Sequence, residues 1–268
     1  MRLAILAFDG LEYALVDLWK KALPYLTQKK YGYFESMEEI TTPFLWATII
    51  TGAQDPRNAL KEYTWSYPAN PVLRFIWKHF RFLRGKGLGK KLRIRRQFVD
   101  KKWLTEKSIF DEYKSLVINF PAYNWSLPDV VWRWSLTEVI GDEERSRTYY
   151  QAILENDSET LRKALRFLER EKDWDIFAVW FYFTDIVNHL YGKNRVKLFT
   201  AYLRANKFAK KLIKAIGNED TVIVIMSDHG GLRGIHTTRA FISVNRENIA
   251  FPRNIKEVYH FFKEILKS

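Results

Sequence analysis

The chain has 268 residues, no cysteine and a formal net charge of +13 at pH 7. Hydrophobic residues make up 47% of it and aromatic residues 16%, which excludes an intrinsically disordered chain. The lack of thiols excludes a disulfide scaffold, a cysteine nucleophile and a thiolate metal site. The positive charge points to an anionic partner, such as nucleic acid, an anionic substrate or a membrane surface.

Two apolar segments bear on targeting. The run before Asp9 is about six residues long, shorter than the apolar core of a secretory signal peptide. The longest apolar stretch, residues 176–183, is far below the ~20 residues that span a bilayer. We therefore expect a cytoplasmic protein with no transmembrane segment.

Short apolar runs alternate with helical periodicity along the chain. Continuous apolar runs predict four buried strands of a parallel sheet, at residues 3–8, 115–120, 176–183 and 221–226. Apolar residues at helical spacing predict helices around residues 161–168, over 195–216 and over 255–267. Gly217 is the expected stop of the second helix. This alternation predicts one α/β domain over residues 1–268, with a mostly parallel sheet and helices on both faces.

One region, residues 53–110, interrupts this pattern and shows no convincing core strand. We interpret it as a basic cap or insertion over one face of the sheet. Within it, residues 74–107 hold thirteen basic and two acidic residues, interleaved with aromatic ones. This run could attract anionic substrates, contact nucleic acid or an anionic membrane surface, or be a charged surface without a partner.

Carboxylates and imidazoles follow the predicted strands where each one ends. In open α/β sheets ligands bind beyond the carboxyl ends of the strands, so these side chains are expected to meet at one edge. Taken singly, an Asp-Gly pair is more often a turn. Together, the carboxylates and imidazoles suit zinc, and also manganese or iron. There are more of these side chains than one tetrahedral ion requires. The set consists of Asp9, Asp185, His189, Asp228, His229 and His236.

A threonine precedes an apolar helical run at Thr42-Pro43. The common meaning of this pattern is an N-cap followed by proline in the first turn. The same geometry would place a hydroxyl beside free N–H groups that can bind a phosphoryl oxygen. Threonine is a weak nucleophile, so this second interpretation requires a base or a metal.

The ordered motifs resemble the alkaline phosphatase superfamily, most closely its type I phosphodiesterase/nucleotide pyrophosphatase branch of archaeal type. The resemblance spans most of the predicted core, and residues 117–123 look like the second-strand turn of archaeal members. The motifs are Phe8-Asp9-Gly10, Thr42 to Gly52, Asp185-x-x-x-His189, Ser227-Asp228-His229-Gly230 and Gly234-x-His236.

This resemblance implies a hydrolase that cleaves phosphodiester or pyrophosphate bonds in nucleotide-like or other small anionic phosphoesters. It implies two divalent metal ions, with zinc expected first and manganese or magnesium also compatible. Thr42 would be the nucleophile, and a phosphothreonyl intermediate would form. The implied ligands are Asp9, Thr42, Asp228 and His229 for one ion and Asp185, His189 and His236 for the other.

Several positions depart from the family pattern, among them the lack of a histidine in residues 56–59, where relatives have glycine-proline-histidine. Relatives usually have Thr-x-Pro, which Thr41 would satisfy better than Thr42, so both threonines stay candidates. A usual glycine is Asn188 here. The asparagine expected three residues after the nucleophile, which binds a phosphoryl oxygen, is Leu45. Two alternatives therefore stay open, namely a phosphomonoesterase or phospho-headgroup transferase on the same core and a non-catalytic phosphate- or nucleic-acid-binding relative.

Overall fold

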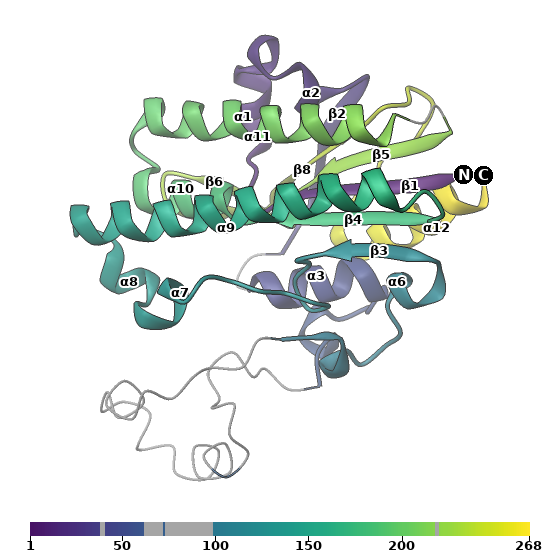
Figure 1. Ribbon diagram of the computed structural model, residues 1–268, viewed down its shortest axis with the longest axis horizontal. Helices are drawn as coiled ribbons and strands as arrows, with labels where there is room; N and C mark the ends of the chain where they lie inside the picture. Colours follow the sequence, from purple (N-terminus) through teal and green to yellow (C-terminus); the bar gives the residue numbers. More distant parts are fainter. Residues whose placement is uncertain (38–40, 62–71, 73–98, 218–219) are drawn as a thin grey trace.

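The structure of the protein is a computed structural model that describes residues 1–37, 41–61, 72, 99–217 and 220–268. Within these residues the core is a six-stranded sheet in the order β2-β8-β5-β1-β4-β3, accompanied by a separate two-stranded hairpin, β6-β7 (Figure 1). The strands are β1 (Arg2–Phe8), β2 (Lys30–Glu35), β3 (Ser115–Ile118), β4 (Ile176–Phe181), β5 (Thr221–Met226), β6 (Gly230–Leu232), β7 (Ile235–Thr237) and β8 (Arg239–Val244).

The sheet is mostly parallel, as predicted. Strand β1 pairs in parallel with β4 on one side and β5 on the other, and β3 continues the parallel set beyond β4. Strand β8 runs antiparallel to both β5 and β2. Every residue of β4 and β5 is buried, which explains why these strands appear as continuous rather than alternating apolar runs.

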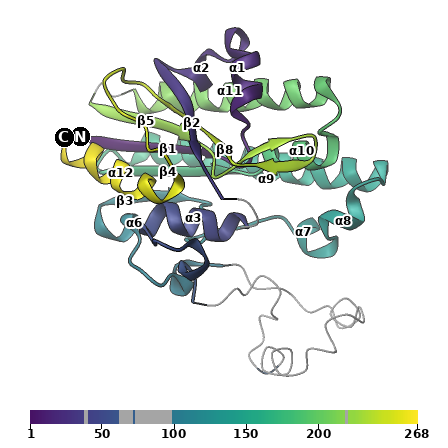
Figure 2. The same cartoon turned by 180° about the vertical axis from the view of Figure 1, so that it is seen from behind.

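Helices cover both faces of the sheet. Figures 1 and 2 show α9 and α11 on one side and α12, with α3 packed against it, on the other. The helices are α1 (Tyr13–Leu18), α2 (Pro24–Thr27), α3 (Thr42–Thr51), α6 (Ile109–Glu112), α7 (Val130–Arg133), α8 (Leu136–Val139), α9 (Glu143–Arg170), α10 (Phe183–Tyr191), α11 (Arg195–Ile216) and α12 (Val258–Lys267), with short 3-10 turns at Lys20–Ala22, Pro56–Asn58, Lys101–Trp103 and Ile255–Glu257.

Local signals in the sequence account for the helix ends. The side chain of Asn194 accepts a hydrogen bond from the first turn of α11, and Gly217 ends this helix with φ of +53°. The helix predicted over residues 195–216 is confirmed. The one predicted over 255–267 divides into a 3-10 turn and α12. The stripe at 161–168 belongs to the much longer α9.

Some predicted boundaries were wrong. The strand expected over 176–183 ends at Phe181, because the chain turns at Tyr182 and Phe183 begins α10. The strand expected over 115–120 ends at Ile118, and Asn119 takes a left-handed conformation with φ of +51°. Strands β2 and β8 and the β6-β7 hairpin were not among the predicted elements.

Within the predicted insertion, the structure describes the two ends and residue 72. There Leu60 bridges to Leu104, and the described residues between 53 and 110 contain no strand. Most of the basic run lies in residues 73–98, outside the described residues, so the cap stays a prediction. Of the helices that the structure describes, none combines the length and the apolar character needed to cross a membrane.

Candidate metal centre

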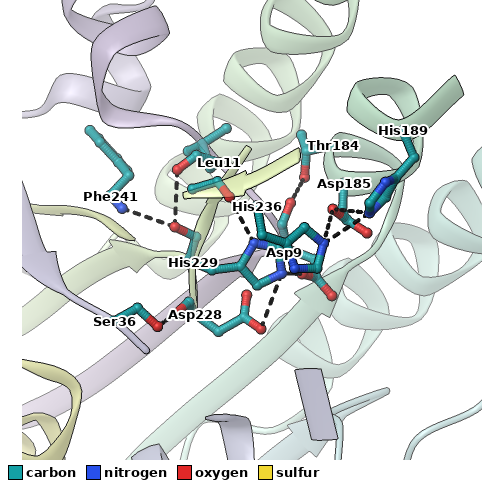
Figure 3. A network of polar contacts seen from close by, with 12 residues as sticks. Asp9, Leu11, Ser36, Thr184, Asp185, His189, Asp228, His229, His236 and Phe241 are labelled. Atoms are coloured by element: carbon teal, nitrogen blue, oxygen red, sulfur yellow. Dashed lines mark hydrogen bonds and ion pairs between the residues drawn. The ribbon is translucent and has the colours of Figure 1, made fainter. Parts of the chain in front are cut away.

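The polar side chains predicted to meet do so at the carboxyl edge of the parallel strands (Figure 3). Asp9 directly follows β1, and Asp185 and His189 lie on α10, just beyond β4. Asp228 and His229 follow β5, and His236 lies in β7 of the hairpin. They form two groups of three, which we call the Asp9 group (Asp9, Asp228 and His229) and the Asp185 group (Asp185, His189 and His236).

The Asp9 group is almost completely buried. His229 is 1% exposed, and Asp9 and Asp228 are 0% exposed. Nε2 of His229 lies 3.2 Å from Oδ1 of Asp9 and 3.7 Å from Oδ2 of Asp228. Nδ1 of His229 lies 2.9 Å from the carbonyl oxygen of Gly230. This contact fixes the ring so that Nε2 faces the two carboxylates, as in metal sites where a backbone carbonyl orients the histidine.

The Asp185 group is more open. Oδ1 of Asp185 lies 3.2 Å from Nε2 of His189 and 3.5 Å from Nε2 of His236. The two Nε2 atoms lie only 2.9 Å apart. The His236 side chain is 40% exposed, whereas that of Asp185 is 4% exposed. The three ligand atoms therefore converge on one point that has access to solvent.

The two groups adjoin each other. The imidazole ring of His229 stacks on that of His236, with centroids 3.8 Å apart and an angle of 23° between the planes. Figure 3 shows the two rings next to each other, with Asp228 on the His229 side and Asp185 and His189 on the His236 side. The centre is therefore one continuous cluster of three carboxylates and three imidazoles.

The charges of the buried groups are strongly coupled. Burial raises the pKa of Asp9 well above its ordinary value, and the nearby charge of Asp228 raises it further. Burial also raises the pKa of Asp228. Burial opposes the charged form of His229, but Asp228 and Asp9 raise its pKa well above the usual value. The one imidazole of the Asp9 group thus faces two carboxylates that cannot both ionise without cost.

The Asp185 group has the opposite balance. Burial alone would raise the pKa of Asp185, but His189 and His236 lower it below its usual range. The pKa of His189 is raised, because the adjacent Asp185 charge outweighs the effect of burial. One carboxylate here faces two imidazoles, so these two groups differ in the charge that each presents to a ligand.

Unsatisfied polar atoms test whether the cluster fits a metal ion. Among the described residues, both carboxylate oxygens of Asp9 and of Asp228 are buried without a hydrogen-bond partner. The same holds for Oδ1 of Asp185 and Nε2 of His229. Buried polar atoms are normally hydrogen-bonded, so atoms left without partners require an explanation. Oxygen and imidazole nitrogen atoms directed at one point are the donor set of zinc and of manganese, and the residues fit such ions.

Thr42 lies apart from these contacts. It is the first residue of α3, and the structure makes Thr41, not Thr42, the N-cap residue, which corrects the expected cap by one position. In the described part of the chain, Thr42 makes no hydrogen bond to either group. Six residues before it, the hydroxyl of Ser36 donates to the carbonyl oxygen of Asp228.

The first turn of α3 has few free donors. The N–H groups of Phe44 and Leu45 donate to the carbonyl oxygen of Thr41, and Pro43 has no N–H. Within the described residues, the backbone N–H of Thr42 is thus the unbonded donor of this turn. Leu45 is 0% exposed and packs in the core, so its side chain does not face the cluster.

Asp157 is a site residue that the sequence analysis missed. It is completely buried in α9, and its Oδ2 accepts hydrogen bonds of 2.8 Å from the backbone N–H groups of Tyr182 and Phe183. These amides begin α10, which carries Asp185 and His189. Asp157 therefore caps the helix that supplies two of the candidate ligands. The sequence does hold a sign of this role, namely a carboxylate within an apolar stripe of the helix. Asp157 lies one helical turn from both Ile153 and Leu161, and both are buried.

Replacing Asp157 with asparagine is expected to change the pH dependence of stability. Burial raises the pKa of Asp157 from 3.8 to about 7. The folded carboxyl therefore holds its proton more tightly than the unfolded one, and stability falls as pH rises from about 4 to 7. Asp157→Asn does not titrate and keeps an oxygen acceptor. It should be more stable than the wild type at pH 8, by up to about 4 kcal/mol.

Urea unfolding of the metal-free protein at about pH 5 and 8 measures this difference. The gain of Asp157→Asn over the wild type should be much larger at pH 8. Equal gains at both pH values would contradict the assignment. Asp111→Asn is the control, since Asp111 is part-exposed and bonded to Lys101 and Tyr123.

Comparisons with known proteins identify a family for this sequence and proteins of similar fold. The sequence matches the model of a family described as type I phosphodiesterase / nucleotide pyrophosphatase over residues 3–243. The fold is similar to that of the PH0037 protein from Pyrococcus horikoshii, with a TM-score of 0.55 and 12% identity over 99% of this chain and 96% of that one. It is also similar to murine ectonucleotide pyrophosphatase/phosphodiesterase 5, with a TM-score of 0.51 and 13% identity over 86% of this chain and 57% of that one. At these identities the likeness shows the fold alone. A comparison with curated proteins finds no match.

Proposed function

The chain belongs to the type I phosphodiesterase/nucleotide pyrophosphatase family, and from this premise we propose that it is a two-metal phosphohydrolase. Membership confirms the resemblance seen in the motifs and identifies a hydrolase of this class. The matched region, residues 3–243, includes all seven residues proposed for the site. The observation that carries the proposal is the pair of adjoining ligand groups with buried oxygen atoms that lack partners.

The proposed ligands follow the two groups. The Asp9 group, completed by the hydroxyl of Thr42, would hold one divalent ion, and the Asp185 group would hold the other. Two such ions would lower the pKa of a hydroxyl or water and offset the negative charge of a phosphoryl group. Zinc is the first expectation, because imidazole nitrogen and carboxylate oxygen are among its usual ligands. Manganese or magnesium is an alternative.

Thr42 is the proposed nucleophile. Its hydroxyl would give up its proton to water, and Oγ1 would form a bond to phosphorus while the bond to the leaving oxygen breaks, so that the electron pair departs with that oxygen. The resulting phosphothreonyl group would then be hydrolysed by water. The unbonded backbone N–H of Thr42 at the start of α3 would donate to a phosphoryl oxygen during this exchange.

A phosphomonoesterase or phospho-headgroup transferase on the same core is the second candidate. The burial of Leu45 supports a different mode of phosphoryl binding from that of relatives with asparagine at this place. The third is a non-catalytic binding relative. We further propose one domain over residues 1–268, with a basic cap at residues 53–110. Its substrates would be small anionic phosphoesters, and residues 74–107 would contact nucleic acid or an anionic membrane surface. The proposed location is cytoplasmic.

Hydrolysis of two chromogenic esters tests the function. We expect turnover of bis-p-nitrophenyl phosphate to exceed that of p-nitrophenyl phosphate, to cease with EDTA and to return when Zn²⁺ or Mn²⁺ is added. A preference for the monoester would favour the second candidate. No turnover of either ester with any of Zn²⁺, Mn²⁺ and Mg²⁺ would favour the binding relative.

A further inference from the structure

We propose that Glu12 and Thr237 form a positioning contact that fixes His236 and thereby completes the second metal site. This inference rests on the proposed two-metal function and deepens it. It concerns the β6-β7 hairpin, which lies outside the main sheet and supplies His236. The other candidate ligands follow central strands or lie on α10, so His236 depends most on contacts beyond its own element.

The hairpin alone gives His236 little support. It has three residues in each strand, joined by Arg233 and Gly234, which both have positive φ angles of 55° and 85°. An isolated two-stranded hairpin is only marginally stable in water. At its tip, Ile235 is 70% exposed. Side-chain contacts to the rest of the protein must therefore fix the hairpin.

Glu12 supplies one such contact. Its Oε2 accepts a 2.5 Å hydrogen bond from the hydroxyl of Thr237, the residue after His236. Its Oε1 accepts from the backbone N–H of Ala14 at the start of α1. The backbone N–H of Glu12 donates to the hydroxyl of Tyr202 on α11. Glu12 is 3% exposed, so it is a fixed anchor rather than a mobile surface carboxylate.

A glycine makes this contact possible. A Cβ atom at Gly230, which pairs with Thr237 across the hairpin, would lie 2.4 Å from Oε2 of Glu12 and 2.2 Å from Oγ1 of Thr237. Real Cβ atoms do not approach other atoms so closely. The close approach therefore requires glycine here and shows how tightly the hairpin is seated on Glu12.

The opposite side of the hairpin is held by Asn188. Its Oδ1 accepts from the backbone N–H of Gly234 in the turn, and its Nδ2 would lie 2.5 Å from a Cβ atom at Gly231. Asn188 lies on α10 next to His189. The hairpin is thus fixed between Glu12 in the loop after β1 and α10, the helix that carries Asp185 and His189, two partners of His236.

The consequence concerns metal affinity. Glu12 is three residues after Asp9, and Thr237 directly follows His236, so their bond joins the Asp9 group to the Asp185 group. Both oxygens of Glu12 already accept hydrogen bonds, which makes it a positioning residue rather than a further ligand. Residues that orient ligands typically change metal affinity by about 10- to 100-fold.

Titration with Co²⁺ alone tests this role without any measurement of activity. We expect the wild-type protein to bind two Co²⁺ ions, and His236→Ala to lose one of them. Thr237→Val and Glu12→Ala should each bind the second Co²⁺ about 10- to 100-fold more weakly, with a changed visible spectrum. Binding of the first ion should change little. Glu12→Gln keeps one oxygen to accept from the N–H of Ala14 and an NH2 group that can donate to the hydroxyl of Thr237, so it should bind close to wild type.

The controls match the residue types. Glu112→Ala removes a carboxylate that binds Tyr259 and Lys263, and Thr200→Val removes a hydroxyl that donates within α11. Both should bind two Co²⁺ ions as the wild type does. If His236→Ala loses an ion but Thr237→Val and Glu12→Ala bind both with wild-type affinity, the positioning role is overturned and the metal centre stands. If the wild type binds fewer than two ions, the proposed function falls with it.

Discussion

Replacing Thr42 with alanine is expected to lower kcat/KM for a phosphodiester by about a thousandfold or more, the scale seen when a nucleophile is removed. The physical reason is that Thr42 is the hydroxyl-bearing residue of the first turn of α3, and its own backbone N–H is unbonded among the described residues. Because Thr42 is half-buried and its hydroxyl makes no hydrogen bond in the described structure, the folded state should lose little stability. Steady-state kinetics with bis-p-nitrophenyl phosphate and thermal unfolding measure the two effects separately.

Two neighbouring variants sharpen this result. Thr42→Ser keeps a hydroxyl and should retain measurable turnover. Thr41→Ala removes the exposed N-cap residue, whose side chain makes no capping hydrogen bond, and should stay within a few-fold of wild type. If Thr41→Ala instead abolishes turnover while Thr42→Ala does not, the nucleophile is Thr41. Trapping of labelled phosphate on the wild-type chain, but not on the inactive variant, would identify the phosphothreonyl group.

Asp228→Asn is expected to abolish binding at the Asp9 group and, at the same time, to stabilise the metal-free protein. Asp228 and Asp9 are both fully buried, and burial together with the charge of Asp228 raises the pKa of Asp9. Removing one charge relieves this repulsion at neutral pH. The expected gain is about 1–2 kcal/mol of unfolding free energy, typical of relieving strain at a functional site.

Chemical unfolding in EDTA and Co²⁺ stoichiometry measure these opposite effects. The variant should bind one ion fewer, and added metal should stabilise it less than it stabilises the wild type. Asp100→Asn is a suitable control, because Asp100 pairs with Lys102 on the surface. A metal-free Asp228→Asn protein that is less stable than the wild type would show that the two carboxylates are not in conflict.

The parallel core could be predicted because strands that are buried on both faces consist of continuous apolar residues. Strands β1, β4 and β5 are short runs without polar interruption. The edge strand β2 could not be found this way, since it is half-exposed, contains Gly32 and alternates weakly. Strand β8 is apolar, but its antiparallel pairing depends on the hairpin before it, which reverses the chain.

The candidate ligands could be predicted because each is a polar residue at the end of an apolar run. Asp9 and Asp228 follow their strands directly, and the structure brings them within one group. The supporting contacts could not be predicted, because they join residues far apart in sequence. Glu12 and Thr237 are separated by 225 positions, and nothing near either residue indicates the other.

The register of β1 also has a consequence for how the protein is made. This strand pairs with Ile176–Phe181 and Thr221–Met226, so both its neighbours leave the ribosome long after it does. Until then the apolar residues 3–8 of this strand have no partner in the sheet. Contacts of such long sequence separation slow folding and expose aggregation-prone strands. We therefore expect the protein to depend on chaperones during synthesis. This dependence follows from having the candidate ligand Asp9 directly after a central strand that is made first.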